Sequence, residues 1–324
     1  MNNKIKIFIF LFIITFSVQA NDILTNYRIN GIKNIEKQMD LKLTEHEYWK
    51  KYLEKRDTKF GYIESYSSLL TCNKEKSELN LYSQDNNNTY KFQKKYSAFT
   101  GKTKGDKIKE GDLKTPIGVY QLIKKIYKLD SFYGPLAFVT SYPNIYDRYK
   151  GKNGSGIWIH GLPQEEKRDK YTKGCIAIDN SNIKKLDEEI DIKNTLLIIN
   201  KSKVQNNISK NILTSILAQL YSWRYAWLYN DINNYLEFYA DDFKRGDGMN
   251  LKRFKKYKTR IFHKKESKNI LFNNITVIPY PNTKDIYQIT FEELYLSQSY
   301  KFTGGKVLMV RVENNNRIKI FTEN

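Results

Sequence analysis

The chain has 324 residues, 40% of them hydrophobic and 14% aromatic, which is enough apolar surface for two compact domains and excludes wholesale disorder. Lys and Arg number 55 against 35 Asp and Glu, so the net charge of +20 favours anionic partners. Three histidines and two cysteines are too few for a disulfide scaffold or a zinc cluster. We therefore predict no metal and no cofactor.

The first twenty residues have the pattern of a secretory signal peptide. Lys4 and Lys6 precede an apolar run over 7–18, and Val-Gln-Ala at 18–20 matches a small-x-small cleavage site. Cleavage after residue 20 removes those two lysines and leaves a periplasmic chain with a net charge of +18. An uncleaved anchor is the alternative, and no later run reaches the roughly 20 apolar residues of a membrane span. Export excludes nucleic acid and leaves cell-wall polymer, anionic lipid or lipopolysaccharide as partners. The lysines are scattered, so most of them are interpreted as solvated surface.

Residues 21–64 are predicted to form a helical arm. Trp49 and Leu53 recur at helical spacing after Thr44 and Glu47, which form a capping-box pattern. A segment of this size cannot bury a core by itself, so it should pack on the next domain or on a second copy of itself. Homodimerisation through the arm is therefore a hypothesis.

The pattern changes at about residue 65 to short β-like runs separated by turn-rich segments. The run Asp-Asn-Asn-Asn at 85–88 indicates a hairpin turn. A mostly β domain is therefore predicted over 65–202. Its expected strands lie at 68–72, 79–82, 90–99, 118–123, 136–140, 156–160, 175–178 and 196–199.

A second domain is predicted over 207–324, after a polar linker. It opens with a helix whose apolar side carries Ile212, Ile216, Leu220, Trp223 and Trp227. A second helix is expected over 231–243, and the chain from 252 onward alternates like strands. The clearest of these strands are 275–278, 286–291, 294–300 and 306–312. Helices followed by a curved sheet describe a cone-like domain, so the fold class is α+β.

His160 and Cys175 are the candidate catalytic pair. They stand 15 residues apart, each at the edge of an apolar run. An imidazole that takes the thiol proton turns a cysteine into a usable nucleophile. Gly174 lets the chain turn sharply and lets backbone N–H groups face an oxyanion. Taken alone, Cys175 is equally consistent with a small buried hydrophobe, and His160 with a hydrogen-bonded core residue.

The context of the pair favours catalysis. His-Gly at 160–161 and Thr-Lys-Gly-Cys-Ile at 172–176 resemble the signature of the YkuD-type L,D-transpeptidase catalytic domain. Lys-Thr-Pro-Ile-Gly-Val-Tyr at 114–120 resembles that family's Thr-Pro-x-Gly-x-Tyr segment, and Tyr-Pro-Asn occurs at 142–144. The resemblance covers roughly residues 66–200.

The resemblance implies a β-sandwich-like catalytic fold with Cys175 as nucleophile, His160 as base and a contribution from the Gly161 backbone. Members of the family form a thioester with the third residue of a peptidoglycan stem and expel the terminal D-Ala. The residues expected to bind the oxyanion or the substrate are Thr172, Lys173 and Gly174.

Two positions depart from the family's usual Ser-His-Gly-Cys-Ile-Arg. Lys173 replaces the histidine and Ala177 replaces the arginine, so substrate handling is expected to differ. The ammonium of Lys173 is a point charge and can replace the planar guanidinium of the family's arginine only in part. The alternative is that Lys173 points into solvent. The altered motif, the arm and the extra domain resemble a narrower group, the L,D-carboxypeptidases that set helical cell shape. In that group water resolves the thioester and leaves a tripeptide stem.

The C-terminal helices look like the start of a domain similar to nuclear transport factor 2 (NTF2), whose sheet encloses a pocket. The similarity lies in Trp-Arg-Tyr-Ala-Trp at 223–227 and in the aromatic positions between 235 and 243. It implies a binding module for glycan or peptide that orients the enzyme on the wall. The alternative is that these aromatic residues are ordinary core at helical spacing.

The leading prediction is a periplasmic L,D-carboxypeptidase that acts on peptidoglycan stem peptides. An L,D-transpeptidase that forms 3-3 cross-links is the first alternative, and a non-catalytic wall-binding scaffold is the second. A disulfide between Cys72 and Cys175 is a further possibility, and a permanent one would remove the nucleophile.

Overall fold

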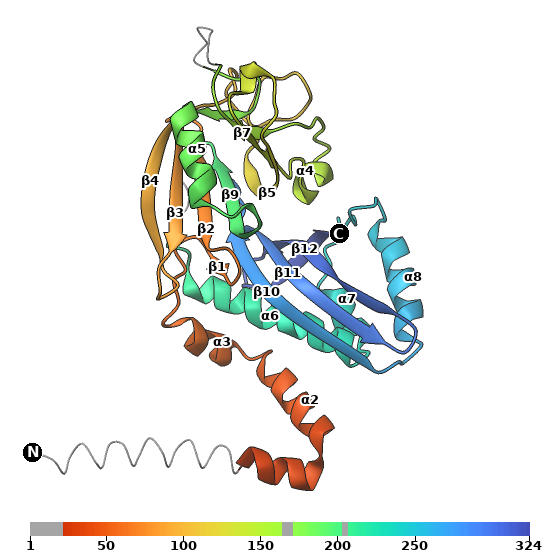
Figure 1. The fold of residues 1–324 in the computed structure, drawn as a ribbon. Helices are drawn as coiled ribbons and strands as arrows, with labels where there is room; N and C mark the ends of the chain where they lie inside the picture. The colour runs from red at the N-terminus through yellow and green to blue at the C-terminus, as the bar shows by residue number, and fades with distance from the viewer. Residues whose placement is uncertain (1–21, 164–170, 203–206) are drawn as a thin grey trace, which may run out of the picture.

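The computed structural model describes residues 22–163, 171–202 and 207–324, and the predicted signal peptide at 1–20 lies outside them. Three parts follow one another along the chain: a helical arm, a β-barrel and a curved sheet flanked by helices (Figure 1). The predicted α+β class is confirmed. Among the described helices, none is both long enough and apolar enough to cross a bilayer.

The arm extends away from the two sheets at its N-terminal end and packs on the C-terminal part at its other end (Figure 1). Its helices are residues 22–30, α2 (Ile32–Lys42) and α3 (His46–Leu53). The helix α3 contacts α6 (Lys210–Leu228), where Trp49 and Leu53 join the apolar core. The structure thus places α3 against the last part of the chain and not against the barrel that follows it in sequence.

The capping box predicted at the start of α3 is wrong. The helix begins after Glu45, whose side chain makes no capping hydrogen bond. The hydroxyl of Thr44 donates instead to the carbonyl of Leu41 at 2.7 Å, because Thr44 still belongs to the turn that ends α2. Thr44 therefore lies outside the N-cap position of α3, which Glu45 occupies.

Eight strands form a closed barrel in the order β2-β3-β4-β8-β7-β6-β5-β9, so the sheet expected to be sandwich-like closes on itself. Closure comes from β2 and β9, which pair in parallel, and β7 and β8 are also parallel neighbours. The strands are β2 (Ser68–Asn73), β3 (Glu78–Gln84), β4 (Tyr90–Phe99), β5 (Gly118–Ile126), β6 (Ala137–Thr140), β7 (Trp158–His160), β8 (Ile176–Ile178) and β9 (Thr195–Asn200).

Short helices join the barrel strands and complete what we call the barrel unit, β2 to β9 with α4 and α5. The helices are η1 (Ser131–Tyr133), α4 (Ile145–Tyr149), α5 (Asn180–Glu189) and η2 (Ile192–Asn194). The helix α5 was not predicted, because only Ile183 and Leu186 of its ten residues face the core. Two apolar positions carry too little periodicity to indicate a helix.

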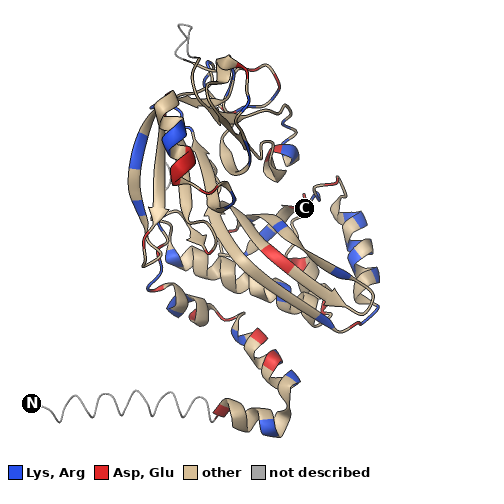
Figure 2. Cartoon of the chain, viewed as in Figure 1, with Lys and Arg blue, Asp and Glu red and all other residues tan. Residues whose placement is uncertain are grey.

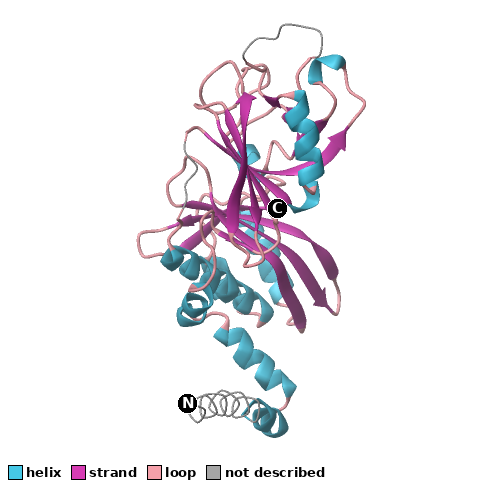
Figure 3. Ribbon diagram, turned by 60° about the vertical axis from the view of Figure 1, so that its left-hand side comes forward, coloured by secondary structure: helices cyan, strands magenta, loops and turns pink. Residues whose placement is uncertain are grey.

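The C-terminal part, which we call the cone unit, wraps an antiparallel sheet around α6 (Figure 3). Its strands, in sheet order, are β1 (Tyr62–Ile63), β10 (Lys268–Pro279), β11 (Ile286–Ser297), β12 (Lys301–Val312) and β13 (Ile318–Glu323). The remaining helices are α7 (Ile232–Glu237) and α8 (Leu251–Phe262). The edge strand β1 comes from the segment between the arm and the barrel.

Three predictions for the cone unit need correction. The second helix ends at Glu237, not at 243. The strands predicted at 286–291 and 294–300 belong mainly to one long strand, β11, and Tyr300 lies in the turn after it. Residues 251–262 form the helix α8 and not a strand, because Asn250 caps the chain by accepting from the backbone N–H of Arg253.

The barrel and cone units share one apolar cluster. Tyr280 of β10 packs edge-on against Tyr146 of α4, with ring centroids 4.7 Å apart. Its hydroxyl accepts a hydrogen bond from Asn144 at 2.9 Å. A Cβ at Gly118 would lie 2.4 Å from that same hydroxyl, so glycine at this motif position is required by the contact between the units.

Candidate active site

The parallel pairing of β7 with β8 brings together the chain segments of the candidate pair. His160 pairs with Ala177, and Ile159 with Ile176. Cys175 lies in the bend just before β8, and His160 is the last residue of β7. The register therefore brings the segment of Cys175 beside that of His160 on neighbouring strands.

The ring of His160 is held in one tautomer. Its Nδ1 lies 2.7 Å from the carbonyl oxygen of Gly161, and since a carbonyl can only accept, Nδ1 carries the proton. The ε nitrogen then carries the lone pair that can take a proton from a thiol. Tyr133 packs edge-on against the ring at a centroid distance of 5.1 Å, and only 1% of His160 is exposed.

Cys175 stands in a tight turn and is partly exposed. Its sulfur donates to the carbonyl of Gly156 at 3.4 Å. The hydroxyl of Thr172 closes the turn, because it donates to the Cys175 carbonyl at 2.6 Å and accepts from the N–H of Gly174 at 3.0 Å. Thr172 and Gly174 therefore shape the turn that presents the thiol.

Glycine at position 174 is required by this turn. Its φ of +139° is one that residues with a side chain rarely adopt, and a Cβ would lie 2.9 Å from the carbonyl oxygen of Lys114. The disulfide considered between Cys72 and Cys175 is not formed in the structure.

The segment at 114–120, which resembles Thr-Pro-x-Gly, is linked by hydrogen bonds to the turn that holds Cys175. The buried hydroxyl of Thr115 accepts from the N–H of Gly101 at 2.8 Å. Gly101 is bridged to Thr172, whose N–H donates to the carbonyl of Thr100 at 2.8 Å. A chain of contacts thus joins the segment at 114–120 to the cysteine turn.

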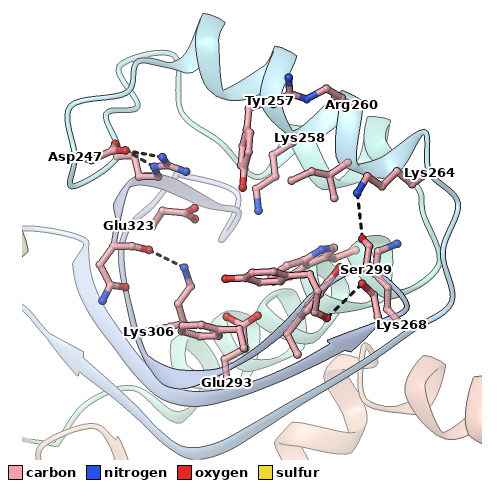
Figure 4. A pocket seen from close by; sticks show the side chains of 18 of the residues that line it. Asp247, Tyr257, Lys258, Arg260, Lys264, Lys268, Glu293, Ser299, Lys306 and Glu323 are labelled. Carbon is pink, nitrogen blue, oxygen red and sulfur yellow. Dashed lines mark hydrogen bonds and ion pairs between the residues drawn. The ribbon is translucent and has the colours of Figure 1, made fainter.

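A second candidate site is a cavity of about 940 Å³ in the cone unit, between α8 and the inner face of the sheet (Figure 4). Charged side chains dominate its lining. The basic residues are Arg148, Arg245, Lys258, Arg260, Lys264, Lys268 and Lys306, and the acidic residues are Asp247, Glu266, Glu293 and Glu323. All of these belong to the cone unit except Arg148, which α4 of the barrel unit contributes.

Lys258 and Lys306 extend into the cavity from opposite walls, α8 and β12 (Figure 4). Lys258 is buried, and its ammonium lies 4.6 Å from the centroid of the Trp227 ring. Burial lowers the pKa of Lys258 to about 8 and raises the pKa of Glu293. A buried cation beside buried carboxylates suits a ligand that carries both an acid and an amine.

The charged wall of this cavity was not predicted, because the lysines were interpreted as scattered solvated surface. Residues 251–265 contain no acidic residue, and in Figure 2 several Lys and Arg positions are coloured blue along α8. A helical signal was present in Asn250 followed by apolar residues at 251, 254 and 261. That pattern predicts a basic helix after Asn250, but it does not predict the cavity that the helix covers.

Family comparisons agree with this arrangement. A model of the L,D-transpeptidase catalytic domain (YkuD) matches residues 67–199, and one of the Cds6 C-terminal NTF2-like domain matches residues 215–324. The crystal structure of the helical cell shape determining protein Pgp2 from Campylobacter jejuni aligns with a TM-score of 0.79 at 35% identity. The alignment covers 87% of this chain and 99% of Pgp2. The chain belongs to the YkuD-type L,D-transpeptidase family.

Two further proteins are similar to this YkuD-type chain. The structure of Bd1075 from Bdellovibrio bacteriovorus aligns with a TM-score of 0.65 at 26% identity, over 83% of this chain and 96% of Bd1075. YafK of Escherichia coli (strain K12), provisionally named as an L,D-transpeptidase, is 34% identical over 104 residues. That match spans 32% of this chain and 38% of YafK, well under two thirds of the curated relative.

The two departures from the YkuD-type motif occupy different environments. Lys173 is exposed, which fits both a side chain in solvent and a contact with substrate. Ala177 is fully buried and pairs with His160 across the strands. Two residues near His160 were not predicted from the sequence. Tyr133 packs on the His160 ring, and the side chain of Asn180 accepts a hydrogen bond from the N–H of Leu162.

Proposed function

We propose that this protein is a peptidoglycan L,D-carboxypeptidase that uses Cys175 as nucleophile and His160 as base. The observation that carries the proposal is the parallel register of β7 and β8, which brings the segments of His160 and Cys175 onto neighbouring strands. The Nδ1–Gly161 hydrogen bond supports it, because it leaves the lone pair on the other ring nitrogen. The similarity to Pgp2, whose name assigns it to helical cell shape, supports a role in wall and cell shape.

The proposed reaction has two halves. The ε nitrogen of His160 takes the proton of the Cys175 thiol, and the sulfur attacks the carbonyl carbon of the third stem residue. The tetrahedral intermediate collapses to a thioester as the terminal D-Ala leaves with the proton from the imidazolium. Water, deprotonated by His160, then hydrolyses the thioester to a tripeptide carboxylate and restores the thiol. Lys173, exposed beside the cysteine turn, is the proposed contact for a substrate carboxylate.

Separation of muropeptides after digestion tests this function. Wild type and Cys72→Ala are expected to convert tetrapeptide stems to tripeptides, whereas Cys175→Ala and His160→Gln are expected to be inactive. Dimers linked 3-3 would instead support the transpeptidase alternative. A wild type that binds sacculi and converts nothing would support the scaffold. Unchanged trimming by Cys175→Ala would overturn the mechanism.

The cavity of the cone unit is the proposed holding site for a second stretch of peptidoglycan. In this scheme residues 65–202 form the catalytic domain and residues 207–324 the accessory NTF2-like domain. Stem peptides are anionic and also carry amines, which matches the mixed lining of the cavity. Lys258→Ala is expected to weaken retention on isolated sacculi, and Lys255→Ala, an exposed position on the same helix, is the matched control. Equal retention of the two variants would contradict the assignment.

A peptidoglycan substrate implies a location outside the cytoplasm, and we propose the periplasm, with cleavage after residue 20. N-terminal sequencing of the protein recovered from a periplasmic extract tests this. A first residue of Asn21 is expected, and an intact Met1 would support the uncleaved anchor instead.

We also propose that the arm mediates homodimerisation. Several of its apolar side chains are exposed, among them Leu24, Ile29 and Ile32, at 54–65% of their surface. Removal of residues 21–41 leaves Trp49 in the core but also removes the buried Ile35 and the Asp40–Arg224 ion pair, so the folding of the shortened chain is checked first by circular dichroism. Light scattering after size-exclusion chromatography should give a dimer for the chain starting at residue 21 and a monomer for the chain starting at 42. A wild-type monomer would contradict the proposal.

A further inference from the structure

The side-chain amide of Asn180 is bonded to the chain just after His160. Its Oδ1 accepts from the N–H of Leu162 at 2.7 Å, and its Nδ2 donates to the carbonyl of Leu162 at 2.8 Å. Asn180 is the first residue of α5 and follows β8 closely, so it belongs to the segment that carries Cys175. These two bonds therefore tie the segment of the nucleophile to the segment of the base.

The hydrogen bond between the N–H of Leu162 and Asn180 affects the orientation of the His160 ring through one peptide plane, that of Gly161 and Leu162. The N–H of Leu162 and the carbonyl of Gly161 belong to the same planar peptide unit and point in opposite directions. When Asn180 holds that N–H, the carbonyl is aimed the other way, where it accepts from Nδ1 of His160 at 2.7 Å. Hydrogen bonds in such a chain also polarise one another, which strengthens the carbonyl as an acceptor.

Two glycines let the amide of Asn180 lie close to the backbone. A Cβ added at Gly161 would lie 2.3 Å from Oδ1 of Asn180 and 2.8 Å from Cδ of Pro135. A Cβ added at Gly134 would lie 2.5 Å from the same oxygen. Glycine at both positions lets the amide approach the backbone, so Gly161 is needed for this contact in addition to any role in binding substrate.

We propose that Asn180 is a positioning residue for the reaction of Cys175 and His160: it orients the Gly161–Leu162 peptide plane that fixes the tautomer and direction of the imidazole. The inference rests on the proposed function, since it assigns Asn180 a part in that same chemistry. Asn180 itself touches neither the sulfur nor the substrate in this scheme. It acts on the base through one peptide unit, as the third member of a nucleophile–base–orienter arrangement.

The alternative is a purely structural role, in which Asn180 only stabilises the loop after β7. Asn180→Ala tests the two against each other, with Asn182→Ala as the matched control. Asn182 lies in the same first turn of α5, and its side chain makes no hydrogen bond to any described residue. We measure kcat and KM on tetrapeptide stems, the pH profile of Cys175 alkylation by iodoacetamide, and thermal unfolding.

A positioning role predicts that Asn180→Ala lowers kcat on the order of 10-fold to 10²-fold, as small displacements of a catalytic group do, with little change in KM. The midpoint of Cys175 alkylation is expected at higher pH than in wild type, because a misdirected imidazole takes the thiol proton less well. Asn180→Asp keeps an acceptor for the N–H of Leu162 and should recover part of the rate. Wild-type kcat and an unshifted alkylation profile in Asn180→Ala would overturn the inference.

Asn180→Ser covers the case in which the alanine variant fails to fold. Serine is favoured at helix starts, and its hydroxyl is too short to reach both groups of Leu162, so the same loss of kcat is expected. A loss of rate in Asn180→Ser that follows only the fraction unfolded would also overturn the inference. If Cys175→Ala still trims stems, the proposed function fails; if it is inactive while Asn180→Ala equals Asn182→Ala, only the inference about Asn180 fails.

Discussion

At the scale of single residues, burial distinguishes the two cysteines. Cys72 is fully buried in β2, and this burial raises the pKa of its thiol to about 12. Cys175 is partly exposed, and its segment lies beside that of His160, whose Nδ1 faces the carbonyl of Gly161. A thiolate is the reactive form, so iodoacetamide should modify Cys175 much faster than Cys72 between pH 7 and 9.

Peptide mass analysis of the alkylated protein measures both rates at once. His160→Gln should slow the modification of Cys175 at neutral pH and leave Cys72 as unreactive as before, because glutamine does not accept the thiol proton. Equal labelling of the two cysteines in folded wild type would contradict this account of the site.

Lys258 gives a pH dependence whose sign follows from its burial. Desolvation lowers the pKa of this lysine to about 8, so it is a cation below that pH and becomes neutral as the pH rises through it. Retention of the protein on anionic sacculi should therefore be greatest below pH 8 and fall between pH 7 and 9. Lys258→Arg stays charged over this range and should lose less retention. A wild type and an arginine variant with the same pH profile would contradict the role of Lys258.

At the scale of secondary-structure elements, α3 is the part of the arm that adds aromatic residues to the core of the cone unit. Trp49 is 4% exposed, its ring lies 5.1 Å from that of Tyr221 in α6, and its Nε1 donates to the carbonyl of Leu43 at 2.7 Å. Trp49→Ala should cost about 3–5 kcal/mol of unfolding free energy, the usual range for a buried aromatic residue.

Chemical denaturation measures this cost, and Tyr27→Ala is the control. Tyr27 is 52% exposed in the projecting part of the arm, so its removal should leave the midpoint within experimental scatter. A stable Trp49→Ala protein would show that α3 contributes little to the core of the cone unit.

At the scale of the whole molecule, the shared cluster joins the barrel and cone units. Tyr280 is 3% exposed and packs with Tyr146 and Asn144 of the other unit. Because apolar side chains from both units meet here, calorimetry should show one unfolding transition for wild type. Tyr280→Ala should lower the free energy of unfolding by about 3–5 kcal/mol and therefore lower the transition temperature. Tyr300→Ala, at an exposed turn, should leave the transition temperature unchanged. Two separate transitions in wild type would contradict this coupling.

Much of the barrel was predictable because its signals are local. Alternating apolar residues and turn residues located all eight strands to within a few residues, and β4 to its observed bounds of Tyr90–Phe99. The long helix α6 was equally clear from its aromatic and aliphatic spacing. Elements with few apolar residues, such as α5, or with many lysines, such as α8, were missed because hydrophobic periodicity is weak in them.

The sequence by itself determined the family and the signature around His160 and Cys175, since both depend on nearby residues. Only the tertiary structure decided how β7 and β8 align, that Asn180 holds the peptide after His160, and that Lys258 lies buried in a cavity. These contacts join positions far apart in the chain or on different elements. Their partners follow from how the sheets close and pack, and no local pattern of residues encodes that closure.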